Sequence, residues 1–144
     1  MIIEGDTEGT ADTILHASEF IDNNDELFIS DSDHCMIWDN EGFENKIKNT
    51  DIDACVMVYP DNQISNAYSY VKLDSMGFVS QAAEKDPISS MAAAGMHYYK
   101  RGSDFVKYAK NMIKDNIRFN DEFYVTPVYN EFIKDDKKII TFPI

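Results

Sequence analysis

The fold is indicated most clearly by residues 27–33, which read LFISDSD. This run is briefly apolar and then turns acidic, which is the pattern of a buried parallel strand that delivers polar side chains at its carboxyl end. Open α/β sheets bind their ligands at that end of the strands. If the chain holds a ligand site, the sequence predicts it at residues 31–33.

Helices and strands alternate on both sides of this run. Apolar residues at helical spacing predict four helices, over about 11–23, over 41–49, from a cap at Ser103 onward, and within 122–132 where Pro127 interrupts or opens the helix. Apolar or alternating runs predict strands over 54–59, 91–99 and 138–142, and a hairpin over 68–82. A short apolar start lies at Ile2-Ile3. This order indicates one α/β layered domain, residues 1–144, with an inserted antiparallel hairpin.

Composition excludes several classes of protein. The 144 residues are 44% hydrophobic, and 13 basic against 26 acidic residues give a net charge of −13. Such a field repels a phosphate backbone, so nucleic acid is not an expected partner. No apolar stretch is long enough for a membrane span and no basic leader is present, so we expect no membrane partner and a cytoplasmic location. Cys35 and Cys55 have no metal-binding spacing and are expected to be buried free thiols.

Two acidic side chains follow the predicted strand, Asp31 and Asp33. Hard oxygen ligands of this kind suit Mg²⁺ or Mn²⁺ that bridges to the phosphates of a bound nucleotide. The alternative is a solvated loop or a helix cap, because an Asp-x-Asp pair is frequent in acidic chains. The position after a strand favours the metal site.

Two other short segments could contact a ligand. The backbone of Gly9-Thr10-Ala11 at a helix start lets a flat base or a phosphate approach closely, although Thr7 or Thr10 could instead be an ordinary helix cap. After the hairpin, Lys85 could meet a phosphate and Glu84 a hydroxyl, although such a turn is often simply solvated.

Histidines and aromatic residues give weaker signals. Of the three histidines only His34 is placed to touch a ligand, and the favoured interpretation even of His34 is a surface residue or one that lies behind the ligand contacts. Trp38 with Met36 and Ile37 is interpreted as core, with stacking on a base or sugar as the alternative. Four tyrosines are expected mainly to pack, namely Tyr98, Tyr99, Tyr124 and Tyr129.

Five segments occur together in a familiar order, at residues 7–13, 28–34, 83–85, 94–99 and 120–124. With them the chain resembles the sugar-phosphate nucleotidyltransferases, which condense a nucleoside triphosphate with a sugar 1-phosphate to give a nucleotide-sugar and pyrophosphate. The resemblance extends over nearly all 144 residues. It implies a three-layer, Rossmann-like mixed sheet of the GT-A type.

The resemblance also implies roles for individual residues. A small Gly-Thr-Ala element contacts the nucleotide base in that family, which falls here on Gly9, Thr10 and Ala11. The acid at the end of the next strand holds the divalent metal, Mg²⁺ or Mn²⁺. That position corresponds to Asp33, with Asp31 as its neighbour.

Four further positions correspond to the sugar side of the family's site. A Glu-Lys pair after the hairpin contacts the sugar and its phosphate, which matches Glu84 and Lys85. Gly95 and Glu122 resemble the remaining sugar-side positions. The resemblance thus implies a nucleotide or nucleotide-sugar as the ligand.

The chain also departs from the family pattern at both ends. Members begin with a strand and a Gly-rich loop that wraps the triphosphate, which does not precede Met1, and they continue into a second metal-binding acid, which does not follow Ile144. The resemblance therefore predicts a truncated domain that lacks the first strands and the Gly-rich loop and is weakly active or inactive alone. An unpaired sheet edge near the N-terminal strand would favour self-association.

Three functions remain open from the sequence. The first is a nucleotidyltransferase-like protein of nucleotide-sugar biosynthesis. The second is a metal-dependent glycosyltransferase that uses a nucleotide-sugar donor through Asp31 and Asp33. The third is a binding or assembly module that has kept the sheet without the chemistry.

Overall fold

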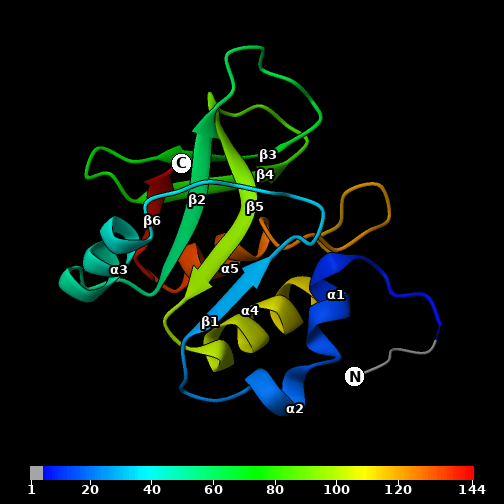
Figure 1. The fold of residues 1–144 in the computed structure, drawn as a ribbon. Helices are drawn as coiled ribbons and strands as arrows, with labels where there is room; N and C mark the ends of the chain where they lie inside the picture. The colour runs from blue at the N-terminus through cyan, green and yellow to red at the C-terminus, as the bar shows by residue number, and fades with distance from the viewer. Residues whose placement is uncertain (1–4) are drawn as a thin grey trace.

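A computed structural model describes residues 5–144, so the predicted apolar start at Ile2-Ile3 lies outside the described residues. The described residues form five helices and six strands (Figure 1). In chain order these are α1 Thr10–Leu15, α2 Ser18–Ile21, β1 Leu27–Ser30, α3 Asn40–Asn49, β2 Ala54–Pro60, β3 Ser69–Leu73, β4 Val79–Glu84, β5 Met91–Tyr99, α4 Gly102–Lys114, α5 Val128–Lys134 and β6 Ile139–Pro143.

The strands form one mixed sheet in the order β4-β3-β5-β2-β6, with β1 paired to β5. β2 and β6 are parallel, and all other pairs are antiparallel. β2 runs along one edge of β5, so the other edge of β5 is shared by β3, which pairs at Ala92, and β1, which pairs at residues 96–99. On this edge, residues 93–95 of β5 therefore lie in a gap between the residue that pairs with β3 and the residues that pair with β1. The candidate site lies at this gap.

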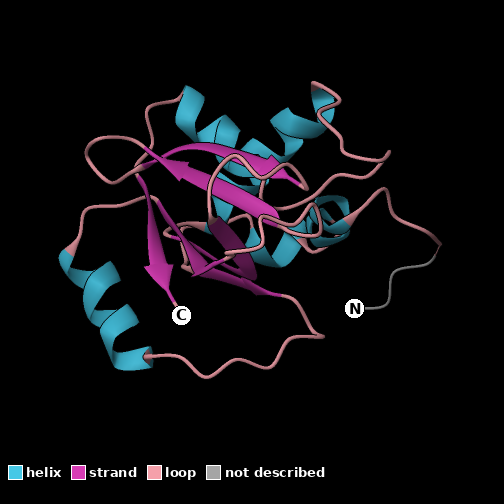
Figure 2. Cartoon of the chain, turned by 90° about the horizontal axis from the view of Figure 1, so that it is seen from above, coloured by secondary structure: helices cyan, strands magenta, loops and turns pink. Residues whose placement is uncertain are grey.

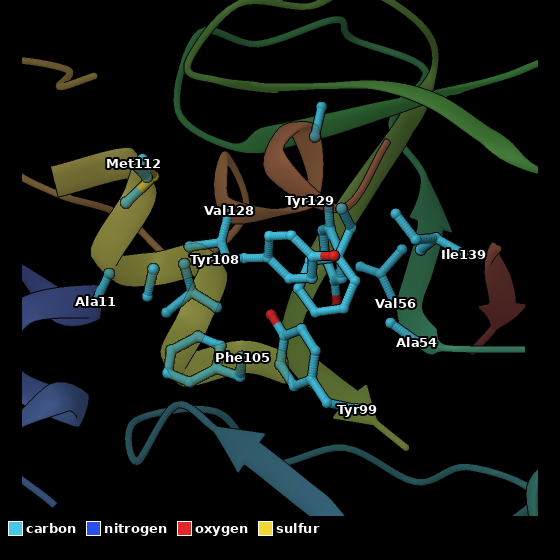
Figure 3. Packing of buried hydrophobic residues seen from close by; sticks show 14 of the residues in the cluster. Ala11, Ala54, Val56, Tyr99, Phe105, Tyr108, Met112, Val128, Tyr129 and Ile139 are labelled. Carbon is cyan, nitrogen blue, oxygen red and sulfur yellow. The ribbon is translucent and has the colours of Figure 1, made fainter. Parts of the chain in front are cut away.

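Helices cover both faces of the sheet, which makes three layers, as predicted. The larger core lies between the sheet and helices α1, α4 and α5. Figure 3 shows its aromatic centre, where Tyr99 stacks on Tyr129 at 5.5 Å between ring centroids and Phe105 packs beside them. Figure 2 shows α3 set apart from the other helices. Phe43 of α3 meets Tyr98 and Phe142 edge-on there, which builds a second, smaller core.

One side chain of α5 ties the hairpin to the helical layer. Asn130 Nδ2 donates to the carbonyl of Ala82 at 2.8 Å, and the Ala82 amide donates to Asn130 Oδ1 at 2.9 Å. The side chain thus replaces a neighbouring strand along the outer edge of β4. This contact fixes the strand two residues before Glu84.

Residues 27–30, which gave the clearest indication of the fold, form a strand of a different kind from the one predicted. β1 is antiparallel to β5 and partly exposed, with Phe28 42% exposed, whereas the sequence predicted a buried parallel strand. The reason is its place, because β1 pairs only with the end of β5 and its four residues cover little of either face. The acidic residues nevertheless follow directly after it.

Three predicted helices have different bounds in the structure. The helix over 11–23 is divided into α1 and α2, because the Ser18 hydroxyl binds the carbonyl of Leu15 where the helix would continue. Ser103 does not cap α4, which begins at Gly102. A Cβ at Gly102 would overlap the carbonyl oxygen of Ile21, so only glycine fits where α2 meets α4.

The helix within 122–132 starts later than predicted. Phe119 and Glu122 form an isolated β-bridge, and α5 begins only at Val128, after Pro127. Proline supplies no amide for a preceding helical turn, which explains why the helix opens there.

Two expectations about burial are wrong. Cys55 is buried, and burial raises the pKa of its thiol to about 12, but Cys35 is exposed on the loop after β1. Ile37 on the same loop is 99% exposed and so is not part of the core, whereas Trp38 packs edge-on against Phe43 at 5.2 Å. None of the helices in residues 5–144 combines the length and apolar character that crossing a bilayer requires.

Candidate ligand site between β3 and β1

A cavity of about 240 Å³ opens at the gap on the edge of β5. Its wall takes residues from six separate segments: the start of α1, the loop after β1, the beginning and the end of the hairpin, strand β5, and residues 124–126 before α5. Five predicted site residues line it, namely Thr10, Asp31, Glu84, Lys85 and Gly95. Segments distant in sequence thus bring polar and charged groups to one place.

Gly95 makes the floor of this cavity possible. It adopts φ +70°, and β5 shifts register against β2 at this point. The Asp31 amide donates to the Gly95 carbonyl at 2.9 Å. A Cβ at position 95 would overlap the Asp31 carboxylate and stand 3.1 Å from His34 Nδ1. Glycine therefore serves both the left-handed backbone and the close approach of the acidic loop.

Partial desolvation perturbs the pKa values of the two carboxylates in the cavity, although the Asp31 side chain is exposed and only Glu84 is buried. Desolvation raises the pKa of Asp31, and the neighbouring His34 opposes the shift. Desolvation also raises the pKa of Glu84, which is only 8% exposed, while a hydrogen bond from the Ser69 hydroxyl counteracts it. Glu84 is thus a buried, oriented acceptor, and the alternative of a solvated turn is wrong for it.

Lys85 is held in place by the turn after α4. Its Nζ donates to the Tyr124 hydroxyl at 3.2 Å and lies 5.0 Å from the centre of that ring. The Tyr124 hydroxyl donates in turn to Glu122 Oε2 at 2.5 Å. The hydrogen bond to Tyr124 raises the pKa of Lys85, so the ammonium stays charged. Lys85 has φ +50°, a backbone strain of the kind that gathers at functional sites.

Only Thr10 of the Gly-Thr-Ala segment lines this cavity. Ala11 is fully buried and its amide donates to the Phe123 carbonyl at 2.9 Å. A Cβ at Gly9 would lie 2.5 Å from the Phe123 amide nitrogen. Gly9 and Ala11 are small because two backbones meet there. The helix cap is Gly9, so the alternative of a threonine cap is wrong.

The second predicted carboxylate, Asp33, lies outside this cavity. It lines an adjoining, more apolar cavity of about 510 Å³, which shares His34, Tyr68 and Ala93 with the first. Ligand atoms of Asp31, Asp33 and His34 nevertheless lie within 4.8 Å of one another. All three side chains are exposed, so they can rotate toward a common ion. This donor set fits a divalent cation.

Sequence reasoning missed several residues of the site. Ser69 and Tyr68 line the cavity because the hairpin pairs Ser69 with Glu84. Tyr124 was expected mainly to pack, yet it also positions Lys85. Predicting these contacts requires the strand register and the turn that brings residue 124 beside residue 85. The aromatic content of residues 119–124 gave a partial signal.

The chain is similar to known proteins in both sequence and fold. The sequence matches the nucleotidyl transferase family over residues 1–139. No curated protein matches it. Among solved structures, a nucleoside-diphosphate-sugar pyrophosphorylase from Vibrio cholerae RC9 is similar at a TM-score of 0.76 and 20% identity, covering 99% of this chain and 59% of that one.

A second solved structure has the same fold. It is described as a glucose-1-phosphate thymidylyltransferase from Bacillus anthracis in complex with a sucrose, with a TM-score of 0.74 and 16% identity. The alignment covers 99% of this chain and 55% of that one. The chain therefore spans little more than half the length of either protein. At these identities the likeness establishes the fold.

Proposed function

Because the chain belongs to the nucleotidyl transferase family, we propose that its cavity binds the sugar-phosphate part of a nucleotide-sugar or its precursor, with a divalent metal ion. The observation that carries this proposal is the convergence of Asp31, Glu84, Lys85 and Gly95 around one cavity. The reaction proposed for the family member is the condensation of a sugar 1-phosphate with a nucleoside triphosphate.

The charges of the cavity support a ligand of this kind. Among the described residues that line it, Lys85 is the only lysine or arginine, whereas Asp31 and Glu84 are acidic. One ammonium suits one phosphate, and the Glu84 carboxylate can accept hydrogen bonds from sugar hydroxyls. A phosphate beside Asp31 needs a cation between the two anions, so binding should depend on the metal. A metal ion held by Asp31 and Asp33 would neutralise the charge of the phosphate.

Replacing Lys85 with methionine is expected to weaken binding of α-glucose 1-phosphate or dTDP-glucose at least about tenfold, because a charge-assisted contact to phosphate is lost. Methionine keeps an unbranched apolar chain only one atom shorter than lysine, and it removes the charge. Isothermal titration calorimetry with Mg²⁺ or Mn²⁺ present measures the change. Lys72, exposed on β3, gives the matched variant Lys72→Met, which should bind as the unaltered protein does.

Three results of this titration separate the functions. Binding of both ligands that weakens in Lys85→Met supports the proposal. Binding of the nucleotide-sugar without the sugar 1-phosphate favours a glycosyltransferase. If no hexose 1-phosphate, nucleotide or nucleotide-sugar binds with either metal ion, the cavity has another purpose and the proposal fails.

The sheet edge supports a second part of the proposal, namely self-association. Within residues 5–144, β1 pairs on one side only, with β5. An open strand edge of this kind favours pairing with another chain. Sedimentation velocity over a concentration series should therefore show a dimer that dissociates on dilution. A single monomeric species at every concentration would contradict this expectation.

A further inference from the structure

We propose that His34 is a third metal ligand beside Asp31 and Asp33, and that the site therefore favours a first-row transition-metal ion over Mg²⁺. The inference rests on the proposed function for the use of the ion, but the binding of the ion can be tested alone. The resemblance to the family assigns no role to the His34 imidazole.

The position of the imidazole carries the first step. His34 Nδ1 lies 3.8 Å from Asp31 Oδ2, and His34 Nε2 lies 3.9 Å from Asp33 Oδ1. The ring thus stands between the two carboxylates, and each nitrogen faces one of them. Metal–ligand bonds of about 2.1 Å place neighbouring ligand atoms about 3 Å apart. Rotation of exposed side chains is sufficient to reach such spacing.

A second observation comes from the facing strand. The space above Gly95, where any other residue would place its Cβ, is filled by the Asp31 carboxylate and flanked by His34 Nδ1 at 3.1 Å. The left-handed backbone of Gly95 and the hydrogen bond from the Asp31 amide fix this approach. Strand β5 therefore leaves room at Gly95 for the carboxylate, with the imidazole beside it.

The chemistry of the donors selects the ion. Mg²⁺ takes oxygen ligands almost throughout, whereas imidazole is a ligand for transition-metal ions. Two carboxylates and one imidazole leave open coordination positions, which phosphate oxygens in the cavity beside Asp31 could occupy. Two carboxylates alone would serve Mg²⁺ well. The imidazole is thus the group that should shift the preference.

Mn²⁺ is the appropriate probe, because it is paramagnetic and because thiolates such as Cys35 select softer ions. Electron spin echo envelope modulation of bound Mn²⁺ should show coupling to an imidazole nitrogen in untagged protein. The coupling should disappear in His34→Ala. Titration calorimetry gives the affinities of this variant for Mn²⁺ and for Mg²⁺. The ratio of the Mn²⁺ affinity to the Mg²⁺ affinity should fall at least roughly tenfold, because the loss of an outer-shell partner of a metal ligand alone costs about that much affinity.

His16 provides the matched control, since it is another exposed histidine, at the end of α1. His16→Ala should keep both the nitrogen coupling and the affinity ratio. Bound Mn²⁺ without nitrogen coupling, an unchanged ratio in His34→Ala, or no Mn²⁺ binding would each overturn the inference. Nitrogen coupling without sugar-phosphate binding would support the inference while the proposed function fails, so the two failures are distinguishable.

Discussion

Gly95→Ala is expected to lower the affinity for Mn²⁺ by about 100-fold or more, at the upper end of what disturbed metal sites lose. The alanine methyl group would occupy the space of the Asp31 carboxylate and press on His34 Nδ1, 3.1 Å away. The Asp31 side chain can only turn away, since its backbone is held to residue 95 by a 2.9 Å hydrogen bond. Titration calorimetry with Mn²⁺ alone measures the loss.

The same substitution is expected to destabilise the fold modestly. Position 95 has φ +70°, and forcing a Cβ into that region costs about 1–2 kcal/mol. Gly77 isolates this cost, because it has φ +87° and a Cβ there would meet nothing within 4 Å. Gly77→Ala should therefore lose comparable unfolding free energy while Mn²⁺ affinity is unchanged.

The comparison of these two alanine variants decides whether the close approach at Gly95 matters. Urea unfolding gives the stability of each, and titration gives the affinity. If Gly95→Ala bound Mn²⁺ as tightly as Gly77→Ala does, the contact between β5 and the acidic loop would have no part in metal binding. Our assignment of the site would then be wrong.

The elements predicted correctly are those whose signal is local. β2, β5 and β6 are continuous apolar runs, and the hairpin is marked by its Asp74-Ser75-Met76-Gly77 turn. β1 was predicted as a strand but with the wrong orientation and burial, because four residues do not tell whether a strand is central or at an edge. Its neighbour in space, β5, lies more than 60 residues away in sequence.

In the candidate site, too, the sequence predicted the residues with a local signal and missed the contacts that depend on distant parts of the chain. Residue type and position after a strand identified Asp31, and the turn after the hairpin identified Glu84 and Lys85. That Glu84 is buried depends on Ser69, which strand register brings opposite it. The position of His34 between two carboxylates follows from the path of an irregular loop, for which periodicity gives no signal.

Stability is expected to fall as the solution becomes acidic, because His97 is buried and neutral. It lies on β5 at 3% exposure, with Nδ1 3.0 Å from the Tyr129 hydroxyl. The same hydroxyl lies within donating distance of the Cys55 carbonyl, at 3.3 Å. Burial lowers the pKa of His97 from 6.5 to about 4. Burial therefore disfavours the charged form of this imidazole in the folded state.

The sign follows from proton binding in the two states. Between pH 6.5 and about 4 the unfolded chain binds a proton at residue 97 that the folded chain does not. The contribution of His97 to stability is thus complete above pH 6.5 and is lost as pH falls toward 4. At 1.36 kcal/mol for each pKa unit, the loss over the whole interval is about 3 kcal/mol. Roughly 2 kcal/mol of it should be gone by about pH 5.

The raised pKa values of Asp31 and Glu84 act in the opposite direction, since the folded state holds those protons more tightly and gains stability on acidification. The effect of His97 is therefore measured as a difference. His97→Asn keeps an amide near the position of Nδ1 and cannot be charged, so its unfolding free energy should depend less on pH than that of the unaltered protein. Urea unfolding between about pH 5 and pH 8 tests this, with His16→Asn as the surface control. Parallel curves for the unaltered protein and His97→Asn would mean that the imidazole is hydrated or charged in the folded state.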